Sequence, residues 1–201
     1  MISIALIDDH PLVMDGIGAW LIGTGRFTIA GTAKTLEKAG ELIKELPQMP
    51  RIIILDISLG AQNGLEFIPS LKDICAERNI PVPGILVCSM YEDPFLIKLA
   101  LDAGANAYVP KSADSDEILK AIDALMEGNT YVDPKYRIII TEQSYTGITR
   151  RENEIIALIK MNFNTKQIAE RLFISIRTVE NHLANIYEKT GVKSKNELKS
   201  L

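Results

Sequence analysis

The sequence predicts an α/β fold, in which a parallel sheet built from five β-α units is followed by a small all-α domain. Two observations lead to this prediction. Over residues 1–128, short apolar runs alternate with helix-length amphipathic segments, whereas after residue 147 the periodicity is purely helical. We therefore expect one domain at 1–128, a linker at 129–147 and a second domain at 148–201.

Five apolar runs are expected to be strands of one sheet. The run Ile52–Leu55 is apolar without alternation, as expected for a strand that is covered on both faces. Strict alternation with helices favours a parallel, doubly wound arrangement. The expected strands are Ile2–Ile7, Phe27–Ala30, Ile52–Leu55, Ile85–Cys88 and Ala107–Val109.

Five helices are expected between and after these strands. Asp93 and Pro94 fit an N-cap and a first helical position, and the run from Asp114 to Glu117 has the spacing of a capping box. The expected helices are Leu12–Ile22, Leu36–Leu46, Gly64–Glu77, Pro94–Ala103 and Asp116–Met126.

The segment from Gly128 to Gly147 interrupts this rhythm with turn-forming residues around an apolar patch at Ile138–Ile140. We expect it to be a linker that packs partly against one domain. Beyond it, capping-box spacing at 149–152 and 194–197 and the glycine at position 191 mark helix ends. The expected helices run from Arg150 to about Met161, from Thr165 to Leu172, from Ser175 to Lys189 and onward from Ser194.

The composition is that of an ordinary soluble protein, with 47% hydrophobic and 24% charged residues. No apolar run approaches the roughly 18 residues that span a bilayer, so no membrane association is expected. The first residues lack the basic start of a signal peptide, and Cys75 and Cys88 are the only cysteines. A reducing cytoplasm is the expected location, and the dispersed cysteines and histidines exclude a zinc-site spacing.

The net charge of -4 is divided unevenly along the chain. Residues 146–201 contain 10 Lys and Arg against 6 Glu, a balance of +4, which leaves -8 for residues 1–145. A basic segment after an acidic one indicates a polyanionic partner for the C-terminal part only.

Acidic, hydroxyl and amine groups fall at the carboxyl ends of four expected strands. Asp8 and Asp9 follow the first strand, Asp56 the third, Ser89 the fourth and Lys111 the fifth. In a doubly wound sheet these ends form one rim, where ligands bind. Three carboxylates repel one another unless a cation is present, and their oxygens suit Mg²⁺.

These groups have complementary roles in phosphoryl chemistry. A carboxylate such as Asp56 attacks a phosphoryl group, and a cation, a lysine and a hydroxyl stabilise the phosphoryl oxygens. Taken singly, each residue has a structural alternative. The aspartates and the serine could cap a helix or turn, and Lys111 could be a solvated surface lysine. Convergence at four strand ends favours the functional interpretation.

Residues 2–128 closely resemble the receiver domain of two-component response regulators, which has a flavodoxin-like (βα)5 fold. The resemblance rests on five segments: Ile7-Asp8-Asp9-His10-Pro11, Leu55-Asp56-Ile57-Ser58, Asn63-Gly64, Val87-Cys88-Ser89-Met90 and 104–111, which ends in Tyr108-Val109-Pro110-Lys111. It departs from the family in the loop after Asp56, which lacks the usual Met-Pro.

The resemblance implies a role for each residue of the rim. Asp56 is phosphorylated by a sensor histidine kinase, and Asp8, Asp9, Asp56 and the Ser58 backbone carbonyl hold Mg²⁺. Ser89 moves toward the phosphoryl group, with which Lys111 pairs. Tyr108 matches the aromatic residue whose rotation reports phosphorylation; simple packing on the surface is the alternative for this tyrosine.

Three helices with a tight turn between the second and third suit a helix-turn-helix domain, whose last helix enters the major groove. The alternative is a small basic helical bundle that binds protein, which has the same periodicity. The segments 148–152, 165–175 and 178–189 resemble the LuxR-type DNA-binding domain, and its combination with a receiver matches the NarL/FixJ class of response regulators.

Hydroxyls near helix starts, basic side chains and asparagines supply the expected DNA contacts. Two positions depart from the family: Glu180 stands where a lysine is frequent, and Ala184 replaces another frequently basic residue. Glu180 repels phosphate if it faces the backbone, or accepts from a cytosine amino group. The expected DNA-binding residues are Thr165, Lys166, Arg177, Thr178, Glu180, Asn181, Asn185 and Lys189.

We therefore expect a non-enzymatic response regulator, in which phosphorylation of Asp56 controls homodimerisation and sequence-specific binding to double-stranded promoter DNA. Two alternatives stay open. A phosphorylation-independent regulator would keep the fold but show no Mg²⁺-dependent labelling of Asp56. A phosphohydrolase with an aspartate nucleophile would turn over an external phosphoester, although the sequence lacks the added cap that such an enzyme needs.

Overall fold

The computed structural model describes residues 1–201 apart from 61, 135, 137–147, 161–162, 173 and 200–201. The chain divides into two compact units, Met1–Arg137 and Ile138–Leu201. None of the helices in the described part of the chain is long and apolar enough to cross a membrane.

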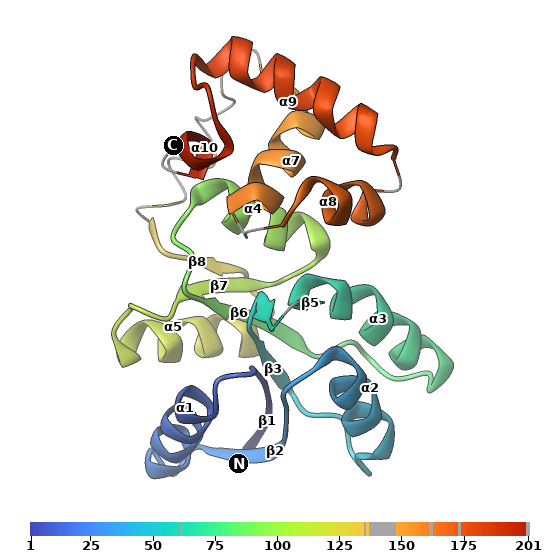
Figure 1. The fold of residues 1–201 in the computed structure, drawn as a ribbon. Coiled ribbons are helices and arrows are strands. Elements are labelled where there is room, and N and C mark those ends of the chain that lie inside the picture. The colour runs from blue at the N-terminus through green and yellow to red at the C-terminus, as the bar shows by residue number, and fades with distance from the viewer. Residues whose placement is uncertain (61, 135, 137–147, 161–162, 173, 200–201) are drawn as a thin grey trace. The chain divides into compact units, whose positions relative to one another are not determined.

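The first unit is built around a parallel sheet of six strands in the order β2-β1-β3-β6-β7-β8 (Figure 1). Every neighbouring pair is parallel, as the strict alternation of strands and helices predicts. All four residues of β3 are buried, in agreement with its unbroken apolar sequence. The strands are β1 (Ile2–Ile7), β2 (Phe27–Ala33), β3 (Ile52–Leu55), β6 (Gly84–Ser89), β7 (Ala107–Pro110) and β8 (Tyr131–Val132).

Helices cover both faces of this sheet (Figure 1). One core cluster joins strand residues to α1 and α5 through side chains such as Leu21 and Ile122, while α2 packs against α3 on the opposite face. The helices are α1 (Pro11–Gly23), α2 (Leu36–Glu45), the 3₁₀ turn η1 (Gly64–Glu66), α3 (Phe67–Glu77), α4 (Pro94–Ala103) and α5 (Ser115–Met126). The predicted doubly wound α/β class is confirmed.

Two short strand pairings were not expected from the sequence. Ser58–Leu59 (β4) and Gln62–Asn63 (β5) form a small antiparallel hairpin directly after Asp56. Tyr131–Val132 adds β8 to the sheet beside β7, within the segment expected to be a linker. The predicted division into 1–128, 129–147 and 148–201 stays a prediction, because residues 137–147, including the apolar patch, lie outside the described residues.

One expected helix cap is wrong. Asp114 is the N-cap of α5, but its side chain accepts no hydrogen bond there. Glu117, the other half of the expected capping box, instead accepts hydrogen bonds from the Tyr131 hydroxyl and from Lys120 Nζ. The Glu117 carboxylate therefore has partners other than the local cap.

The second unit is all-α in its described part, as predicted. Its helices are α7 (Arg150–Lys160), α8 (Thr165–Arg171), α9 (Ile176–Thr190) and α10 (Lys195–Lys199). The expected capping box at 149–152 forms, because Thr149 N–H donates to Glu152 Oε2 at 2.7 Å and Glu152 N–H donates to Thr149 Oγ1 at 3.3 Å. Helix α9 ends at Gly191, which has a φ of 76°.

Candidate functional site

Strand order reverses between β1 and β3. The chain runs from β1 to β2 on one side of this point, and from β3 to β6 on the other. Ligands of doubly wound sheets bind at this point, beyond the carboxyl ends of the strands. Asp8 and Asp9 follow β1, Asp56 follows β3, Ser89 is the last residue of β6, and Lys111 follows β7. The fold therefore positions the predicted groups at one rim.

Lys111 is the centre of this rim. Its Nζ lies 2.6 Å from Asp8 Oδ2 and 2.7 Å from Asp56 Oδ2, so one ammonium group bridges two carboxylates. The side chains are almost inaccessible, with 6% of Lys111 and 2% of Asp56 exposed. The alternative that Lys111 is a solvated surface lysine is therefore wrong.

Burial and charge act in opposite directions on these groups. Burial raises the pKa of Asp56 above its ordinary value, although the hydrogen bond from Lys111 acts to lower it. Burial lowers the pKa of Lys111, but its hydrogen bonds to Asp56 and Asp8 outweigh this effect, so the net shift is upward. Lys111 is thus held in its charged form.

A third carboxylate completes the cluster. Asp9 Oδ2 accepts a hydrogen bond from Gly60 N–H at 2.8 Å. Asp9 Oδ1 is inaccessible to solvent and accepts no hydrogen bond from the described residues; His10 Nδ1 lies 2.9 Å away without the alignment of one. Ligand atoms of Asp8, Asp9, His10 and Asp56 lie within 4.8 Å of one another, so this group could hold a metal ion.

The hairpin β4–β5 shapes the loop beside Asp56. Ser58 N–H donates to Asp56 Oδ1 at 3.3 Å, and Gly60 has a φ of 58°, which favours glycine. A Cβ atom on Gly64 would lie 1.8 Å from the backbone oxygen of Asp56, so only glycine fits there. These contacts hold the described residues of the loop, which lacks the Met-Pro pair of the family, close to Asp56.

Ser89 and Tyr108 are both buried beside the acidic cluster. Ser89 is 0% exposed, and its hydroxyl has no hydrogen-bond partner among the described residues. Tyr108 is also 0% exposed and donates from its hydroxyl to the backbone oxygen of Tyr91 at 2.7 Å. Surface packing, the alternative for Tyr108, is therefore wrong, and burial raises the pKa of its phenol.

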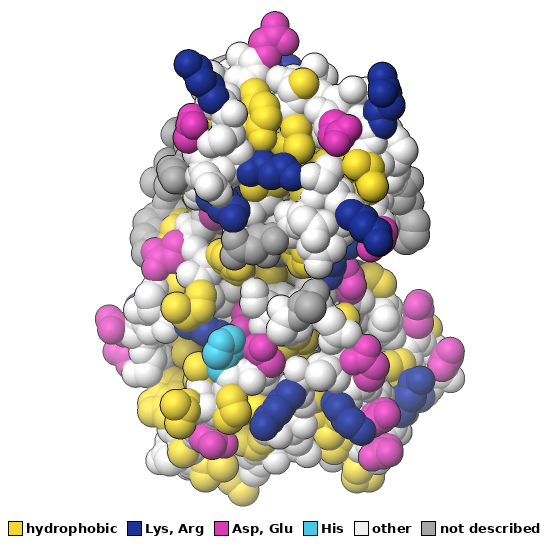
Figure 2. All heavy atoms as spheres, viewed as in Figure 1, with side chains coloured by type: hydrophobic (Ala, Val, Ile, Leu, Met, Phe, Trp, Pro, Cys, Tyr) yellow, Lys and Arg dark blue, Asp and Glu magenta, His cyan; other side chains and the backbone are white. Residues whose placement is uncertain are grey.

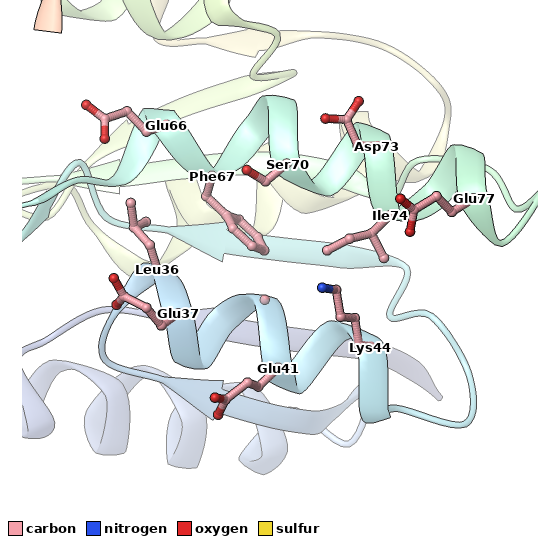
Figure 3. Close-up of a pocket in the computed structure, with 11 residues that line it drawn as sticks. Leu36, Glu37, Glu41, Lys44, Glu66, Phe67, Ser70, Asp73, Ile74 and Glu77 are labelled. Atoms are coloured by element: carbon pink, nitrogen blue, oxygen red, sulfur yellow. The ribbon is translucent and has the colours of Figure 1, made fainter.

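A separate cavity of about 400 Å³ lies between α2 and α3 (Figure 3). Phe67 and Ile74 form its apolar wall, and acidic side chains such as Glu41 and Asp73 line its edges. None of the residues around it belongs to the acidic cluster at the strand ends. The cavity is therefore not part of the candidate site.

In the second unit, one helix presents most of the residues that were predicted to bind DNA. Val179, Leu183 and Ile186 of α9 are buried in the core. The opposite side of α9 is exposed and contains Arg177, Glu180, Asn181 and Asn185, with Ala184 between them. Lys and Arg side chains are spread over the visible face of this unit and do not form one patch (Figure 2).

The remaining predicted DNA residues make contacts within the unit. Thr178 Oγ1 lies 2.8 Å from the hydroxyl of Ser175, the N-cap of α9. Thr165 Oγ1 accepts a hydrogen bond from Lys195 Nζ. Lys166 is 75% exposed, with its Nζ 4.0 Å from Glu170. Four predicted residues therefore share the exposed side of α9. Thr178 and Thr165 instead make hydrogen bonds within the unit, and Lys166 lies on α8.

Lys189 has a structural partner that sequence reasoning missed. Its Nζ donates to both carboxylate oxygens of Glu152, at 2.8 and 2.7 Å, and Glu152 is only 2% exposed. Burial would raise the pKa of Glu152, but hydrogen bonds from Lys189 and Thr149 outweigh it and hold the pKa below its ordinary value. This pair joins the start of α7 to the end of α9.

Comparisons with known families agree with both units. Residues 4–123 match the family described as response regulator receiver domain, and residues 146–201 match the bacterial regulatory proteins, luxR family. The chain is 28% identical to the transcriptional regulatory protein DegU of Brevibacillus brevis, over 98% of this chain and 90% of that protein. It is 30% identical to the oxygen regulatory protein NreC of Staphylococcus carnosus, over 98% and 94%.

Solved structures show the same fold. RcsB from Salmonella enterica serovar Typhimurium, bound to the promoter rprA with the phosphomimetic BeF3⁻, has a TM-score of 0.74 over 99% of this chain and 96% of that chain, at 22% identity. A two-component response regulator of the LuxR family from Aurantimonas is 28% identical, with a TM-score of 0.60 over 70% and 95%. The chain therefore belongs to the NarL/FixJ class of two-component response regulators, which join a receiver domain to a LuxR-type DNA-binding domain.

Proposed function

We propose that this chain is a transcription regulator whose binding to double-stranded promoter DNA is controlled by phosphorylation of Asp56. The observation that supports it best is the buried bridge of Lys111 between Asp8 and Asp56, with the unpartnered Ser89 hydroxyl close by. A site that holds a nucleophilic carboxylate, a charged lysine and a free hydroxyl suits phosphoryl transfer.

The donor set fits Mg²⁺. Three carboxylates face one another, Lys111 bridges two of them, and Asp9 Oδ1 is a buried acceptor that lacks a hydrogen bond within the described chain. Hard oxygen donors of this kind suit Mg²⁺, and Asp8, Asp9, Asp56 and the Ser58 carbonyl would hold it. When bound, the ion supplies positive charge that offsets the negative charge of the phosphoryl oxygens.

Asp56 is the phosphoryl acceptor in this proposal. A carboxylate oxygen of Asp56 attacks the phosphorus of a phosphohistidine on a sensor histidine kinase. The phosphorus–nitrogen bond breaks with its electron pair left on the imidazole, and a phosphorus–oxygen bond to Asp56 forms. Lys111 exchanges one carboxylate partner for a phosphoryl oxygen, and Ser89 donates its hydroxyl proton in a hydrogen bond to another.

The DNA contact is assigned to the exposed side of α9. Asn181 and Asn185 have the donor and acceptor pairs that read base edges, and Arg177 contacts phosphate. Phosphorylation favours a homodimer, and two linked recognition helices then bind two half-sites with a gain from effective concentration. Because the proposed target is promoter DNA, we expect this protein to act in the cytoplasm.

Labelling of Asp56 tests this function directly. The full chain is incubated with a small phosphodonor and either Mg²⁺ or a chelator, and the modified residue is located by mass spectrometry. We expect one phosphoryl group, on Asp56, only with Mg²⁺, and none on Asp56→Asn. Asp73→Asn, which changes an exposed aspartate of α3, should label like the wild type. Unmodified Asp56 with Mg²⁺ present would overturn the proposal.

A further inference from the structure

Glu92 lies three residues after Ser89, in the loop between β6 and α4. Its carboxylate joins this loop to two other segments. Oε1 accepts a hydrogen bond from the Ser112 hydroxyl, and Oε2 accepts one from the Tyr136 hydroxyl at 2.7 Å. One side chain therefore connects parts of the first unit that are distant in sequence.

The two loops that Glu92 connects both carry groups of the candidate site. Ser112 is the residue after Lys111, and Glu92 follows Ser89. Tyr91, between Ser89 and Glu92, accepts the hydrogen bond of Tyr108 at its backbone oxygen. Glu92 therefore links the loop that follows Ser89 to the loop that follows Lys111.

Tyr136 belongs to the segment that continues beyond the sheet toward the second unit. It is 5% exposed and lies four residues after β8, which pairs with β7 so that Val132 is opposite Tyr108. The chain before Tyr136 is thus held by strand pairing, and the Tyr136 hydroxyl is held by Glu92. Nothing in this arrangement depends on the position of the second unit.

We propose that the Glu92 carboxylate is a clasp that transmits the state of Asp56 to the segment 131–136, and so to the chain that leads to the DNA-binding unit. The inference rests on the proposed phosphorylation of Asp56. A phosphoryl group draws Ser89 and Lys111 toward it, because it offers each a stronger acceptor than it has in this structure. Glu92 moves with the two loops, and its hydrogen bond with the Tyr136 hydroxyl breaks.

The expected size of the effect follows from the hydrogen bond that is lost. A hydrogen bond between neutral groups shifts an equilibrium by about threefold to tenfold, and one to a carboxylate by at least as much. That is within the usual range of coupling between two sites of a protein. Removing the Tyr136 hydroxyl alone should therefore mimic release and reduce the response to phosphorylation by a similar factor.

Hydrogen exchange of the amides in 131–136 measures this directly, on the full chain with and without Mg²⁺ and a small phosphodonor. In the wild type, exchange should rise at least about threefold on phosphorylation. In Tyr136→Phe it should already be raised without the donor and change little further. Tyr131→Phe controls for the loss of a hydroxyl in the same segment: it removes the hydrogen bond to Glu117 on α5, and its exchange should still rise when the donor is added.

The same variants are compared for DNA binding. The ratio of DNA affinities with and without the donor should fall by about threefold or more in Tyr136→Phe and stay unchanged in Tyr131→Phe. Combining Tyr136→Phe with Glu92→Ala should add little to either single change, as expected for residues that act through one contact.

The outcomes separate the clasp from the proposed function. If Asp56 is labelled but exchange at 131–136 is the same in both states, or Tyr136→Phe responds like the wild type, the clasp is wrong and phosphorylation control stands. If Asp56 is not labelled in the presence of Mg²⁺, both fail together. Raised exchange in the unmodified Tyr136→Phe variant, with normal labelling of Asp56, supports the clasp.

Discussion

The two candidate functional regions of this molecule are built in opposite ways. The proposed phosphoryl site gathers residues from the ends of separate strands into a buried cluster, in which Lys111 bridges Asp8 and Asp56. The proposed DNA contact is a stretch of one helix whose side chains, among them Asn181 and Asn185, are exposed. The first region depends on the whole fold, whereas the second depends on the orientation of α9.

This difference predicts where substitutions act. A buried charge that loses its partner cannot recover solvation, so changes in the cluster should affect stability as well as chemistry. Exposed polar side chains contribute little to folding, so changes on the face of α9 should affect DNA binding alone. Glu152 is the exception in the second unit, because it is buried and paired like the residues of the cluster.

The largest effect is expected for Lys111→Met, which leaves two buried carboxylates without their cation. It should lower the free energy of unfolding of the first unit by about 3 kcal/mol in the presence of a chelator, measured by urea unfolding. Mg²⁺ should recover part of this loss. Lys98→Met, on the exposed side of α4, should change stability by less than about 0.5 kcal/mol. Equal stability of the two variants would contradict the charge bridge.

Glu152→Gln should lower the stability of the second unit by about 2 kcal/mol, because the buried carboxylate accepts from both Lys189 and Thr149. Urea unfolding of the full chain, monitored with a probe that reports on the second unit, measures this loss. Glu170→Gln is the matched control, since Glu170 is 65% exposed and lies 4.0 Å from Lys166. A loss of the same size in both variants would show that burial of Glu152 has no consequence.

The pH dependence of the same variants sharpens this test. The pKa of Glu152 is lowered in the folded state, so its contribution is present above the ordinary carboxyl pKa of 4.5 and is lost as the pH falls through the lowered folded value. The difference in stability between wild type and Glu152→Gln should therefore shrink steadily in acid. A difference that stays constant from neutral pH to pH 3 would argue against the ion pair.

Asn181→Ala should weaken binding to promoter DNA by about 1–3 kcal/mol and leave unfolding unchanged. The DNA is a fragment selected from random sequences by the wild-type protein, and fluorescence anisotropy measures its affinity beside that of an unrelated duplex. Binding to the unrelated duplex should change much less. Asn129→Ala in the first unit is the control. An equal loss on both duplexes would mean that Asn181 does not read a base.

The smallest effect is expected for Glu180→Lys. Replacing an exposed anion of α9 by a cation should tighten DNA binding by about threefold to tenfold and steepen the salt dependence by about 0.9 for each additional phosphate that the protein neutralises. Glu127→Lys, an equal charge change in the first unit, should alter neither. Unchanged affinity of Glu180→Lys would place Glu180 away from the phosphates.

The sequence predicted the strands and helices that carry the site well, because each depends on local apolar patterns. It also placed Asp8, Asp56, Ser89 and Lys111 at one rim, because parallel strands end on the same side. The contact of Lys111 with both carboxylates, and the burial of Tyr108, depend on tertiary packing that no local pattern encodes.

Other features could not be predicted, for related reasons. The two residues of β8 follow Gly128 and Asn129 and are too few to show a strand pattern. The partnership of Glu152 with Lys189 spans 37 residues, so the sequence showed only the capping role of Glu152. The charge of Lys189 predicts a contact with DNA, but its ammonium group donates hydrogen bonds to Glu152 within the unit. The predicted DNA residues stay predictions.

Affinity for promoter DNA, with and without phosphorylation, tests the central claim that the buried cluster controls the exposed helix. The measurement compares wild type with Asp56→Asn in Mg²⁺, each with and without a small phosphodonor. We predict that the donor tightens DNA binding of the wild type by about fivefold or more, the lower end of usual coupling, and leaves Asp56→Asn unchanged. Equal affinities for wild type with and without the donor, once labelling of Asp56 is verified, would contradict the account.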